Sequence, residues 1–327
     1  MTIPSSVVVT GAAGQDGYFL SKYLRRAGVL RVTGVVRPGT HAQVGSNRFR
    51  WFTDIEEADL ADHSTLTAMV AALKPDWILN FGAIASSLTQ QQDPLRLYSV
   101  NTLAPAAMLE AVRKYSPATL FVQASSSEVF AGGSISPQTL DTPRVPRTIY
   151  GATKIGADNL VSVFRNSFGI NALSVILYSH ESPLRHPHFF SRTIITNALN
   201  VLEGRQERIM VHSPDAVRDW GYAGEYCHLL VSRLIAGQYG DFILGSGVRA
   251  TVRDFARAVC DQLHISYADR VDELPLQIGR VTESLDVIAD LSTYNPWPGR
   301  APGYGLPRLI EFLLRFEKHG QRSRIPH

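Results

Sequence analysis

The sequence has little of what secreted or nucleic-acid-binding proteins usually contain. It has two cysteines in 327 residues, Cys227 and Cys260, which lie far apart in stretches with helical spacing. We therefore expect two buried thiols rather than a disulfide or a metal site. The formal net charge is only +3. This gives no reason to expect a nucleic-acid partner, although a basic pocket for phosphate groups is compatible with it.

The sequence also has no long apolar run, and we expect no targeting segment. No apolar run reaches the length that is needed to cross a bilayer. Residues 1–4 lack a basic stretch followed by an apolar stretch, so we expect no secretory signal. We expect a cytoplasmic protein with no membrane partner. Hydrophobic residues make up 45% of the chain and charged residues 19%, as in ordinary globular proteins, and the length fits one or two domains.

The chain begins with a strand, a glycine-rich turn and a helix. Residues 7–10 form a short β-branched run, and residues 18–27 have helical spacing. Glycines between a strand and a helix allow a tight turn and let a pyrophosphate approach the N-terminal end of the helix. In this context the pattern predicts a dinucleotide-binding site. The predicted contacts in the turn are Gly11, Gly14, Gln15, Asp16 and Gly17.

The end of the second predicted strand, residues 32–36, bears on the choice of cofactor. An acidic residue there would bind the ribose 2′-hydroxyl of NAD. The chain has Arg37 instead, and an arginine can pair with the 2′-phosphate of NADP. The sequence therefore favours NADP, and a solvated surface arginine is the alternative.

Strands and helices alternate up to Leu177, which predicts an α/β fold with a Rossmann-type, doubly wound parallel sheet. After Leu177 the alternation breaks, and we expect a smaller, interleaved C-terminal substrate domain. The predicted NADP-binding domain comprises 1–178 and about 213–247, and the substrate-binding domain 179–212 and 248–327. Further expected elements are a strand at 49–52, a helix at 94–115 distorted near Pro105, a loop at 132–146 and a turn at 218–221.

The strand expected at residues 120–124 ends in three hydroxyl groups and a carboxylate, Ser125 to Glu128. In open α/β sheets ligands bind beyond the carboxyl ends of the strands, so these groups should lie at the mouth of a site. Tyr150 and Lys154 begin a later predicted helix and share one face of it. An ammonium group beside a phenol lowers the pKa of the phenol, which can then act as a general base. An ordinary surface pair is the alternative for these two residues.

Several collinear motifs resemble one known family. The chain resembles the extended short-chain dehydrogenase/reductases, and among them the GDP-mannose 4,6-dehydratases. The resemblance covers most of the chain up to about Phe255. It implies an NADP-dependent lyase that converts GDP-mannose, or a related GDP-sugar, to a 4-keto-6-deoxy sugar by elimination of water. The matching stretches are Val9–Gly17, Gln123–Glu128, Tyr150–Lys154, His180–Arg185 and Arg218–Gly221.

The resemblance implies four catalytic residues. Tyr150 would take the proton of the sugar C4 hydroxyl while hydride passes to the nicotinamide, and Lys154 would hold the cofactor ribose. Ser126 stands where the family usually has a threonine that hydrogen-bonds O4. Glu128 would remove the C5 proton and assist loss of water from C6. An epimerase needs no such carboxylate, so Glu128 favours elimination.

The resemblance also implies further contacts with the cofactor and the substrate. Arginine forks suit diphosphate oxygens, which Arg218 and Arg280 would hold. On the substrate side the chain departs from the family: Ile84 and Thr193 stand where the family has glutamine and lysine. The identities of the sugar and of the nucleotide base therefore stay open. The expected cofactor contacts are Asp59, Leu60, Gly82, Ala83, His180 and Arg185, and the expected substrate contacts are Ser179, Arg218, Arg280 and Glu283.

Two other functions stay open. A nucleotide-sugar epimerase or 4-keto reductase could use the same scaffold, and a non-catalytic dinucleotide-binding protein is a third possibility. By the same resemblance we expect a homodimer or a homotetramer.

Overall fold

The computed structural model describes residues 3–85, 93–274, 286–292 and 305–318, which form two compact units. The first unit comprises Met1–Gly133, Thr142–Leu177 and Tyr226–Leu244, and the second comprises Ser134–Asp141, Tyr178–Glu225 and Gly245–His327. These boundaries differ from the predicted domain ranges at residues 134–141 and 213–225. The roles predicted for the two domains stay predictions.

The first unit is built on one seven-stranded sheet in which every pair of neighbouring strands is parallel. The strand order is β10-β6-β5-β4-β1-β2-β3, so the chain runs outward from β1 in both directions. This is the doubly wound topology, and it confirms the predicted fold class. The strands are β1 (Ser6–Thr10), β2 (Arg31–Val36), β3 (Asp54–Glu57), β4 (Trp77–Asn80), β5 (Leu120–Ser126), β6 (Ala172–Leu177) and β10 (Phe242–Leu244).

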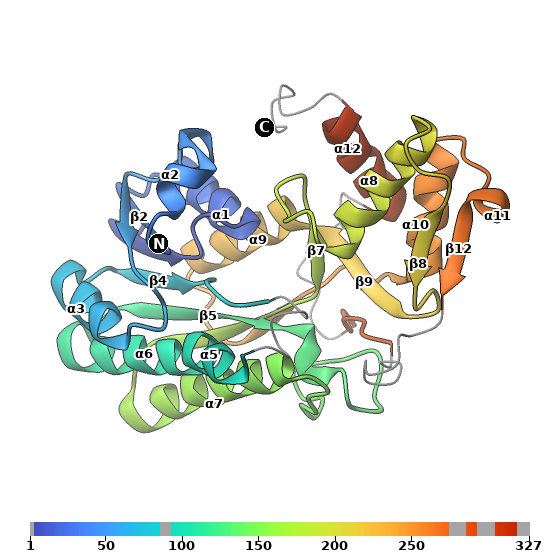
Figure 1. Cartoon of the computed structure of the whole chain (residues 1–327). Helices are drawn as coiled ribbons and strands as arrows, with labels where there is room; N and C mark the ends of the chain where they lie inside the picture. The colour runs from blue at the N-terminus through green and yellow to red at the C-terminus, as the bar shows by residue number, and fades with distance from the viewer. Residues whose placement is uncertain (1–2, 86–92, 275–285, 293–304, 319–327) are drawn as a thin grey trace. The chain divides into compact units, whose positions relative to one another are not determined.

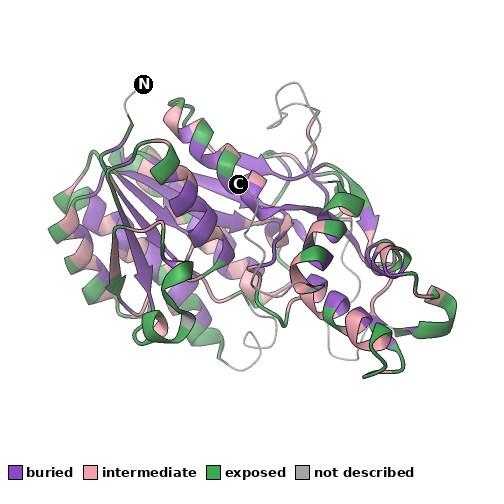
Figure 2. Cartoon of the chain, turned by 90° about the horizontal axis from the view of Figure 1, so that it is seen from above, coloured by how far each residue is buried: buried purple, intermediate pink, exposed green. Residues whose placement is uncertain are grey.

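Helices cover both faces of this sheet. In Figure 1, α1 and α9 lie on one face, and α3, α6 and α7 lie on the other. The central strands are therefore buried on both sides, as their almost continuous apolar sequences require; Figure 2 shows them in purple. The helices of this unit are α1 (Gln15–Arg26), α2 (Thr40–Val44), α3 (His63–Leu73), α5 (Pro94–Tyr98), α6 (Ala104–Tyr115), α7 (Ile149–Phe168) and α9 (Ala223–Ile235).

The helix predicted at residues 94–115 is present but interrupted. A π-helical segment, Ser99–Leu103, separates α5 from α6. Asn101 lies in this segment, and its amide group bonds both to the backbone N–H and to the carbonyl of Ile84. Pro105 is accommodated in the first turn of α6, where no intrahelical N–H bond is lost. The distortion therefore lies just before the proline.

Two predictions of local structure are wrong. Residues 49–52 form a turn after a short 3₁₀ helix, and the third strand is β3, which begins at Asp54. Phe49 is buried because it packs against Ala12 and Val36 rather than because it lies in a strand. Residues 218–221, expected as a turn, belong to β9 (Val217–Tyr222), whose backbone pairs with strands on both sides.

A row of polar side chains crosses three central strands, from the carboxyl ends of β1 and β4 to the middle of β5. Thr10 of β1, Asn80 of β4 and Gln123 of β5 are aligned by the sheet register and buried. The Thr10 hydroxyl donates to Oδ1 of Asn80 at 2.6 Å, and Nδ2 of Asn80 donates to Oε1 of Gln123 at 2.7 Å. Nε2 of Gln123 donates to the Ala124 carbonyl, and Thr10 Oγ1 accepts the N–H of Gly82. This polar row fixes the strand ends relative to one another.

The second unit contains two small sheets. In the first, β9 pairs in parallel with β7 (Ser179–Glu181) and antiparallel with β11 (Arg249–Thr251). In the second, β8 (Ile209–His212) pairs with β12 (Val271–Leu274). Phe190, Trp220 and Phe255 pack together in its core, with ring centroids 5.2–6.1 Å apart. Its helices are α8 (Phe190–Leu202), α10 (Val252–Gln262), α11 (Tyr267–Arg270) and α12 (Leu306–Lys318).

The polar row leads to a prediction about stability. Asn80→Leu would leave the Thr10 hydroxyl and the Gln123 amide without their buried partner, so we expect a loss of about 2–4 kcal/mol in the free energy of unfolding. Urea unfolding measures it. The double variant Asn80→Leu/Gln123→Leu should be at least as stable as the single one, because one orphaned group is removed. A loss below about 0.5 kcal/mol for Asn80→Leu would contradict the structural role of the row.

Candidate active site

The glycine turn between β1 and α1 forms a cradle that only glycine can form. Gly11 has φ of +70°, and a Cβ there would lie 2.9 Å from the backbone of Gly82. A Cβ on Gly17 would lie 2.6 Å from the backbone of Ala12. The Gly14 N–H donates to the Gly11 carbonyl at 2.9 Å, which closes the turn directly before α1. The free N–H groups of a helix N-terminus favour a phosphate here, so the cradle fits a dinucleotide.

Gln15 and Asp16 lie in the first turn of α1 as predicted. Gln15 is buried, and Asp16 is near the thiol of Cys227, whose Sγ lies 3.9 Å from Oδ1 of Asp16. Burial and this carboxylate raise the pKa of the Cys227 thiol well above its usual value. Cys227 and Cys260 are both buried free thiols, as predicted.

The residues expected around the adenosine lie at the carboxyl ends of β2, β3 and β4. Arg37 is exposed, directly after β2. The N–H of Ala61, a hydrogen bond from Arg96 at 2.7 Å and the charge of Arg37 together lower the pKa of Asp59. Arg37 and Asp59 are therefore close enough to interact. Leu60 packs against Gly82, where a Cβ would meet its methyl group at 2.5 Å, and Ala83 follows.

Ser126 and Glu128 lie at the carboxyl end of β5, as predicted. Ser126 caps a short 3₁₀ helix, Ser127–Phe130, and its hydroxyl accepts the N–H of Glu128 at 3.3 Å. Both residues are half-buried, so their side chains are held by local structure but still reachable.

Tyr150 and Lys154 lie in the first two turns of α7. Thr148 caps this helix by accepting the N–H of Gly151 at 3.0 Å, which fixes the start of the helix. Nζ of Lys154 lies 5.7 Å from the centre of the Tyr150 ring and donates to the Ala124 carbonyl at 2.9 Å. Burial lowers the pKa of Lys154 to about 8, and the charge of Asp158 acts in the opposite direction.

Gly151 brings the tyrosine and the carboxylate segments together. A Cβ on Gly151 would lie 2.8 Å from the carbonyl oxygen of Glu128. The backbones beside Tyr150 and at Glu128 are therefore in direct contact. The structure thus places the four predicted catalytic residues of the first unit at one site, where β5 ends and α7 begins.

Four predicted contacts lie in the second unit. Ser179 and His180 are in β7, opposite Trp220 and Gly221 of β9. Nδ1 of His180 must carry a proton, because its partner at 2.7 Å is the carbonyl of Tyr178, which can only accept. Arg185 donates to the His180 carbonyl at 2.8 Å.

Arg218 precedes a buried carboxylate that organises this part of the second unit. Nη1 of Arg218 donates to the Val217 carbonyl. The next residue, Asp219, accepts N–H groups from Ser246, Gly247 and Ala289. The contacts of Ser179, His180, Arg185 and Arg218 with any ligand stay predictions. Arg280 and Glu283 lie outside the described residues.

Sequence reasoning missed residues that hold this site. Asn101 donates to the hydroxyl of Thr153, which in turn donates to the Tyr150 carbonyl at 2.7 Å. Gln123 holds the Ala124 carbonyl that receives Lys154. The sequence shows polar residues in otherwise apolar strands, such as Asn80 and Gln123. Only the order of the strands in the sheet shows that these residues meet.

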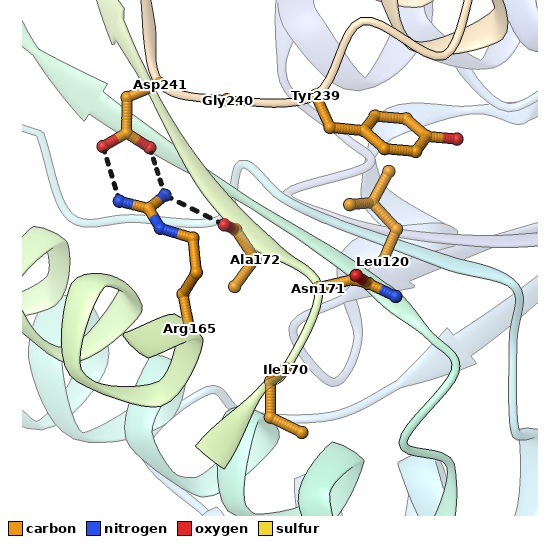
Figure 3. Close-up of a pocket in the computed structure, with 8 residues that line it drawn as sticks. All are labelled: Leu120, Arg165, Ile170, Asn171, Ala172, Tyr239, Gly240 and Asp241. Carbon is orange, nitrogen blue, oxygen red and sulfur yellow. Dashed lines mark hydrogen bonds and ion pairs between the residues drawn. The ribbon is translucent and has the colours of Figure 1, made fainter. Parts of the chain in front are cut away.

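The cavity in Figure 3 lies elsewhere. It has a volume of about 330 Å³ and opens at the starts of β5 and β6, near Leu120 and Ala172. The predicted catalytic residues lie at the carboxyl end of β5 and on α7, whereas this cavity lies at the opposite end of the strands. Among the residues that line it, Arg165 and Asp241 form an ion pair, and Asp241 also accepts the N–H of Ser174.

Comparison with known proteins shows the family of this chain. A profile of the family described as GDP-mannose 4,6 dehydratase matches residues 8–296. The chain belongs to this family. A GDP-mannose 4,6-dehydratase of Vibrio cholerae is 30% identical over 269 residues, which are 79% of this chain and 72% of that protein. GDP-mannose 4,6 dehydratase 1 of Arabidopsis thaliana is 28% identical over 320 residues, 94% of this chain and 88% of that protein.

Solved structures of related chemistry share the fold. A dTDP-glucose 4,6-dehydratase of Bacillus anthracis, in complex with NAD, has a TM-score of 0.77 at 19% identity and covers 96% of this chain and 97% of its own. A UDP-glucose 4-epimerase of Thermotoga maritima has a TM-score of 0.81 at 18% identity and covers 96% and 99%. At these low identities, the two structures show only that the chain shares their fold.

The contact at Gly151 leads to a prediction. Gly151→Ala would push the start of α7 away from Glu128, and we expect kcat/KM to fall by roughly 10–100-fold while the protein still folds. Gly156→Ala is the matched control on the same helix, because its nearest neighbour is a side-chain methyl of Thr102. Steady-state kinetics with circular dichroism test both. Unchanged kinetics for Gly151→Ala would show that the close approach is not needed.

Proposed function

We propose that this protein is an NADP-dependent nucleotide-sugar 4,6-dehydratase, which converts GDP-mannose or a related GDP-sugar to its 4-keto-6-deoxy form. The observation that carries the proposal is that the backbone of Glu128 lies against the start of α7, the helix that carries Tyr150 and Lys154. A carboxylate beside the base of an oxidoreductase site has a use in elimination, whereas epimerisation needs none. The chemistry named for the curated relatives supports the same reaction class.

The chain's own residues divide the proton transfers between them. Tyr150 accepts the proton of the C4 hydroxyl, and Lys154 stabilises the phenolate that this transfer requires. The bound nicotinamide supplies hydride chemistry. The resulting C4 ketone acidifies the C5 position, so that a carboxylate such as Glu128 suffices as the base. Protonated Glu128 would then assist departure of the C6 hydroxyl as water, and Ser126 would hold O4. Hydride return to C6 and delivery to C5 of the proton held by Tyr150 would complete the 4-keto-6-deoxy product, so that the nicotinamide would be oxidised again at the end of the cycle.

The glycine cradle at Gly11, Gly14 and Gly17 would hold the pyrophosphate of the cofactor, and Lys154 its ribose. We favour NADP because Arg37 follows β2 and can pair with a 2′-phosphate. One structure with the same fold was solved with NAD, which supports a nicotinamide dinucleotide as the cofactor. The preference for NADP over NAD rests on Arg37 alone. His180 and Arg185 are proposed as further cofactor contacts.

The second unit would bind the nucleotide sugar. Ser179, Arg218, Arg280 and Glu283 are the proposed contacts, with the arginines on the diphosphate.

We propose a cytoplasmic homodimer that forms through α5–α6 and α7, or a homotetramer. Exposed apolar side chains on these helices support this interface, among them Leu95, Leu103 and Val163. No helix in the described part of the chain is long and apolar enough to cross a membrane.

The direct test is turnover. Incubation with GDP-mannose and catalytic NADP should yield a 4-keto-6-deoxy product, detected by mass spectrometry as loss of water, without net consumption of the cofactor. Stoichiometric consumption of NADPH would indicate a reductase, and an epimeric product of unchanged mass would indicate an epimerase. If no GDP-, UDP- or dTDP-linked hexose or heptose is converted, the proposal fails.

Glu128→Gln separates elimination from oxidation. We expect product formation to fall by at least about 10²-fold, because a general acid–base catalyst is lost. Exchange of the sugar C4 hydrogen with labelled cofactor should persist, since Tyr150 and Lys154 are intact. The variant Glu207→Gln, at an exposed position of the second unit, serves as the control for a change of charge alone. Full product formation by Glu128→Gln would contradict the assigned role.

Arg37→Ala tests the cofactor. We expect the Kd for NADP to rise by roughly 10–100-fold, as for the loss of a charge-assisted hydrogen bond, while the Kd for NAD changes little. Fluorescence titration with both cofactors measures this difference. Equal weakening of both would mean that Arg37 does not read the 2′-phosphate.

A further inference from the structure

Glu181 is a buried carboxylate of the second unit that the proposed mechanism does not use. It is the last residue of β7 and is 4% exposed. The hydroxyl of Ser191, in the first turn of α8, donates to its Oε2. The same oxygen lies 3.2 Å from Nε of Arg185, with which Glu181 forms an ion pair. One carboxylate thus joins the end of β7, the segment that follows it and the start of α8.

The guanidinium group of Arg185 is held on one face and along one side. Its Nε lies against Glu181 and is shielded from solvent, and its Nη1 donates to the His180 carbonyl at 2.8 Å. The ring of Phe189 covers one face, with its centre 4.1 Å from Cζ of Arg185. Such a stack of a cation on an aromatic ring is attractive.

The Nη2 end of Arg185 is the part that stays available. Among the residues that the structure describes, none forms a hydrogen bond with Nη2. The side chain is 20% exposed, so this end is reachable from solvent. Arginine carries its N–H donors in a rigid, planar fork that suits phosphate oxygens. Because Glu181, the His180 carbonyl and Phe189 fix the other parts of the fork, the direction of the Nη2 donors is set before any ligand binds.

We propose that Glu181 is a positioning residue, which holds the Arg185 guanidinium by its Nε side and thereby directs the Nη2 end toward phosphate oxygens of the cofactor. The inference rests on the proposed function, in which Arg185 contacts a nicotinamide dinucleotide. It adds that this donor is ordered in advance by a buried carboxylate. Glu181 itself contacts neither the cofactor nor a reacting atom.

The direction in which cofactor affinity changes separates three roles of Glu181. If it positions Arg185, loss of its charge frees the guanidinium and weakens binding, because binding must then order the side chain. If its charge acted on the cofactor directly, the same loss would tighten binding, because a carboxylate repels phosphate. A role confined to packing would lower stability and leave the affinity unchanged.

The first experiment is a fluorescence titration of the full-length chain with NADP. We expect Glu181→Gln to raise the Kd by roughly 3–10-fold, as for the ordering of one long side chain on binding. In an Arg185→Met background the same change should cause no further rise. Glu273→Gln is the matched control, since Glu273 also pairs with an arginine of the second unit, Arg253, at 2.7 Å. It should leave the Kd unchanged.

A second readout needs no ligand. In NMR spectra of isotopically labelled protein, the Nε–H signal of Arg185, assigned with Arg185→Lys, should exchange slowly with solvent because Nε is shielded. In Glu181→Gln this protection should be lost, and in Glu273→Gln it should persist. Glu181→Asp, which keeps the charge but withdraws it from Nε, is the second variant if the amide prevents folding, and it should act in the same direction.

Three results would overturn the proposal: a Kd that falls or stays constant in the folded Glu181 variants, a rise that persists without Arg185, or an Nε–H signal that exchanges equally fast with and without Glu181. The failure of the proposed function looks different. If the unaltered protein binds no nicotinamide dinucleotide and converts no nucleotide sugar, the proposed function fails, and the NMR readout alone decides whether Glu181 holds Arg185.

Discussion

The hydrogen-bonded row across β1, β4 and β5 is the constraint on which the site depends. It begins at the N–H of Gly82, beside the glycine cradle, and passes through Thr10, Asn80 and Gln123 to the Ala124 carbonyl. That carbonyl also receives Lys154. The cradle that fits a dinucleotide and the ammonium of the proposed catalytic pair are thus ends of one buried network. Such a network holds its members rigidly as long as every member is satisfied.

Burial of the Lys154 ammonium is unfavourable in free energy, and it also lowers the pKa of the group. An ammonium group in an apolar surrounding is unfavourable unless it is well hydrogen-bonded or paired. The carbonyl of Ala124 and the charge of Asp158 supply this compensation, and the pKa of Lys154 still falls to about 8. A lysine close to its titration point responds to small changes nearby. In the proposed mechanism the ammonium stabilises the Tyr150 phenolate, so a change in the charge of Lys154 would change the pKa of that phenol.

The fold could be predicted from the sequence because its signals are local. Apolar runs, helical spacing and the glycine turn are each read within a few residues, and together they predict the doubly wound sheet and the cradle. The motifs also placed Ser126, Glu128, Tyr150 and Lys154 at one site. The polar row could not be predicted, because Thr10 and Asn80 meet only through strand order, across 70 residues.

Other failures have similar physical causes. Arg218 to Gly221 is polar and aromatic and reads as a turn, yet its backbone is paired on both sides within β9. Phe49 reads as a strand residue because it is apolar, although its burial comes from a turn over Ala12 and Val36. The sequence predicts no role for Asp158. Its partners, Ser125 and Arg144, become visible only once the end of β5 lies against α7.

The pKa of the Lys154 side chain tests the buried network most directly. It can be measured by NMR titration of the protein with isotopically labelled lysine, and Lys154→Met assigns the signal. We expect a midpoint near 8, well below that of the exposed lysines, because the ammonium is buried. A midpoint near 10.5, the ordinary value of a lysine, would contradict this, because the ammonium would then be solvated rather than held in the network.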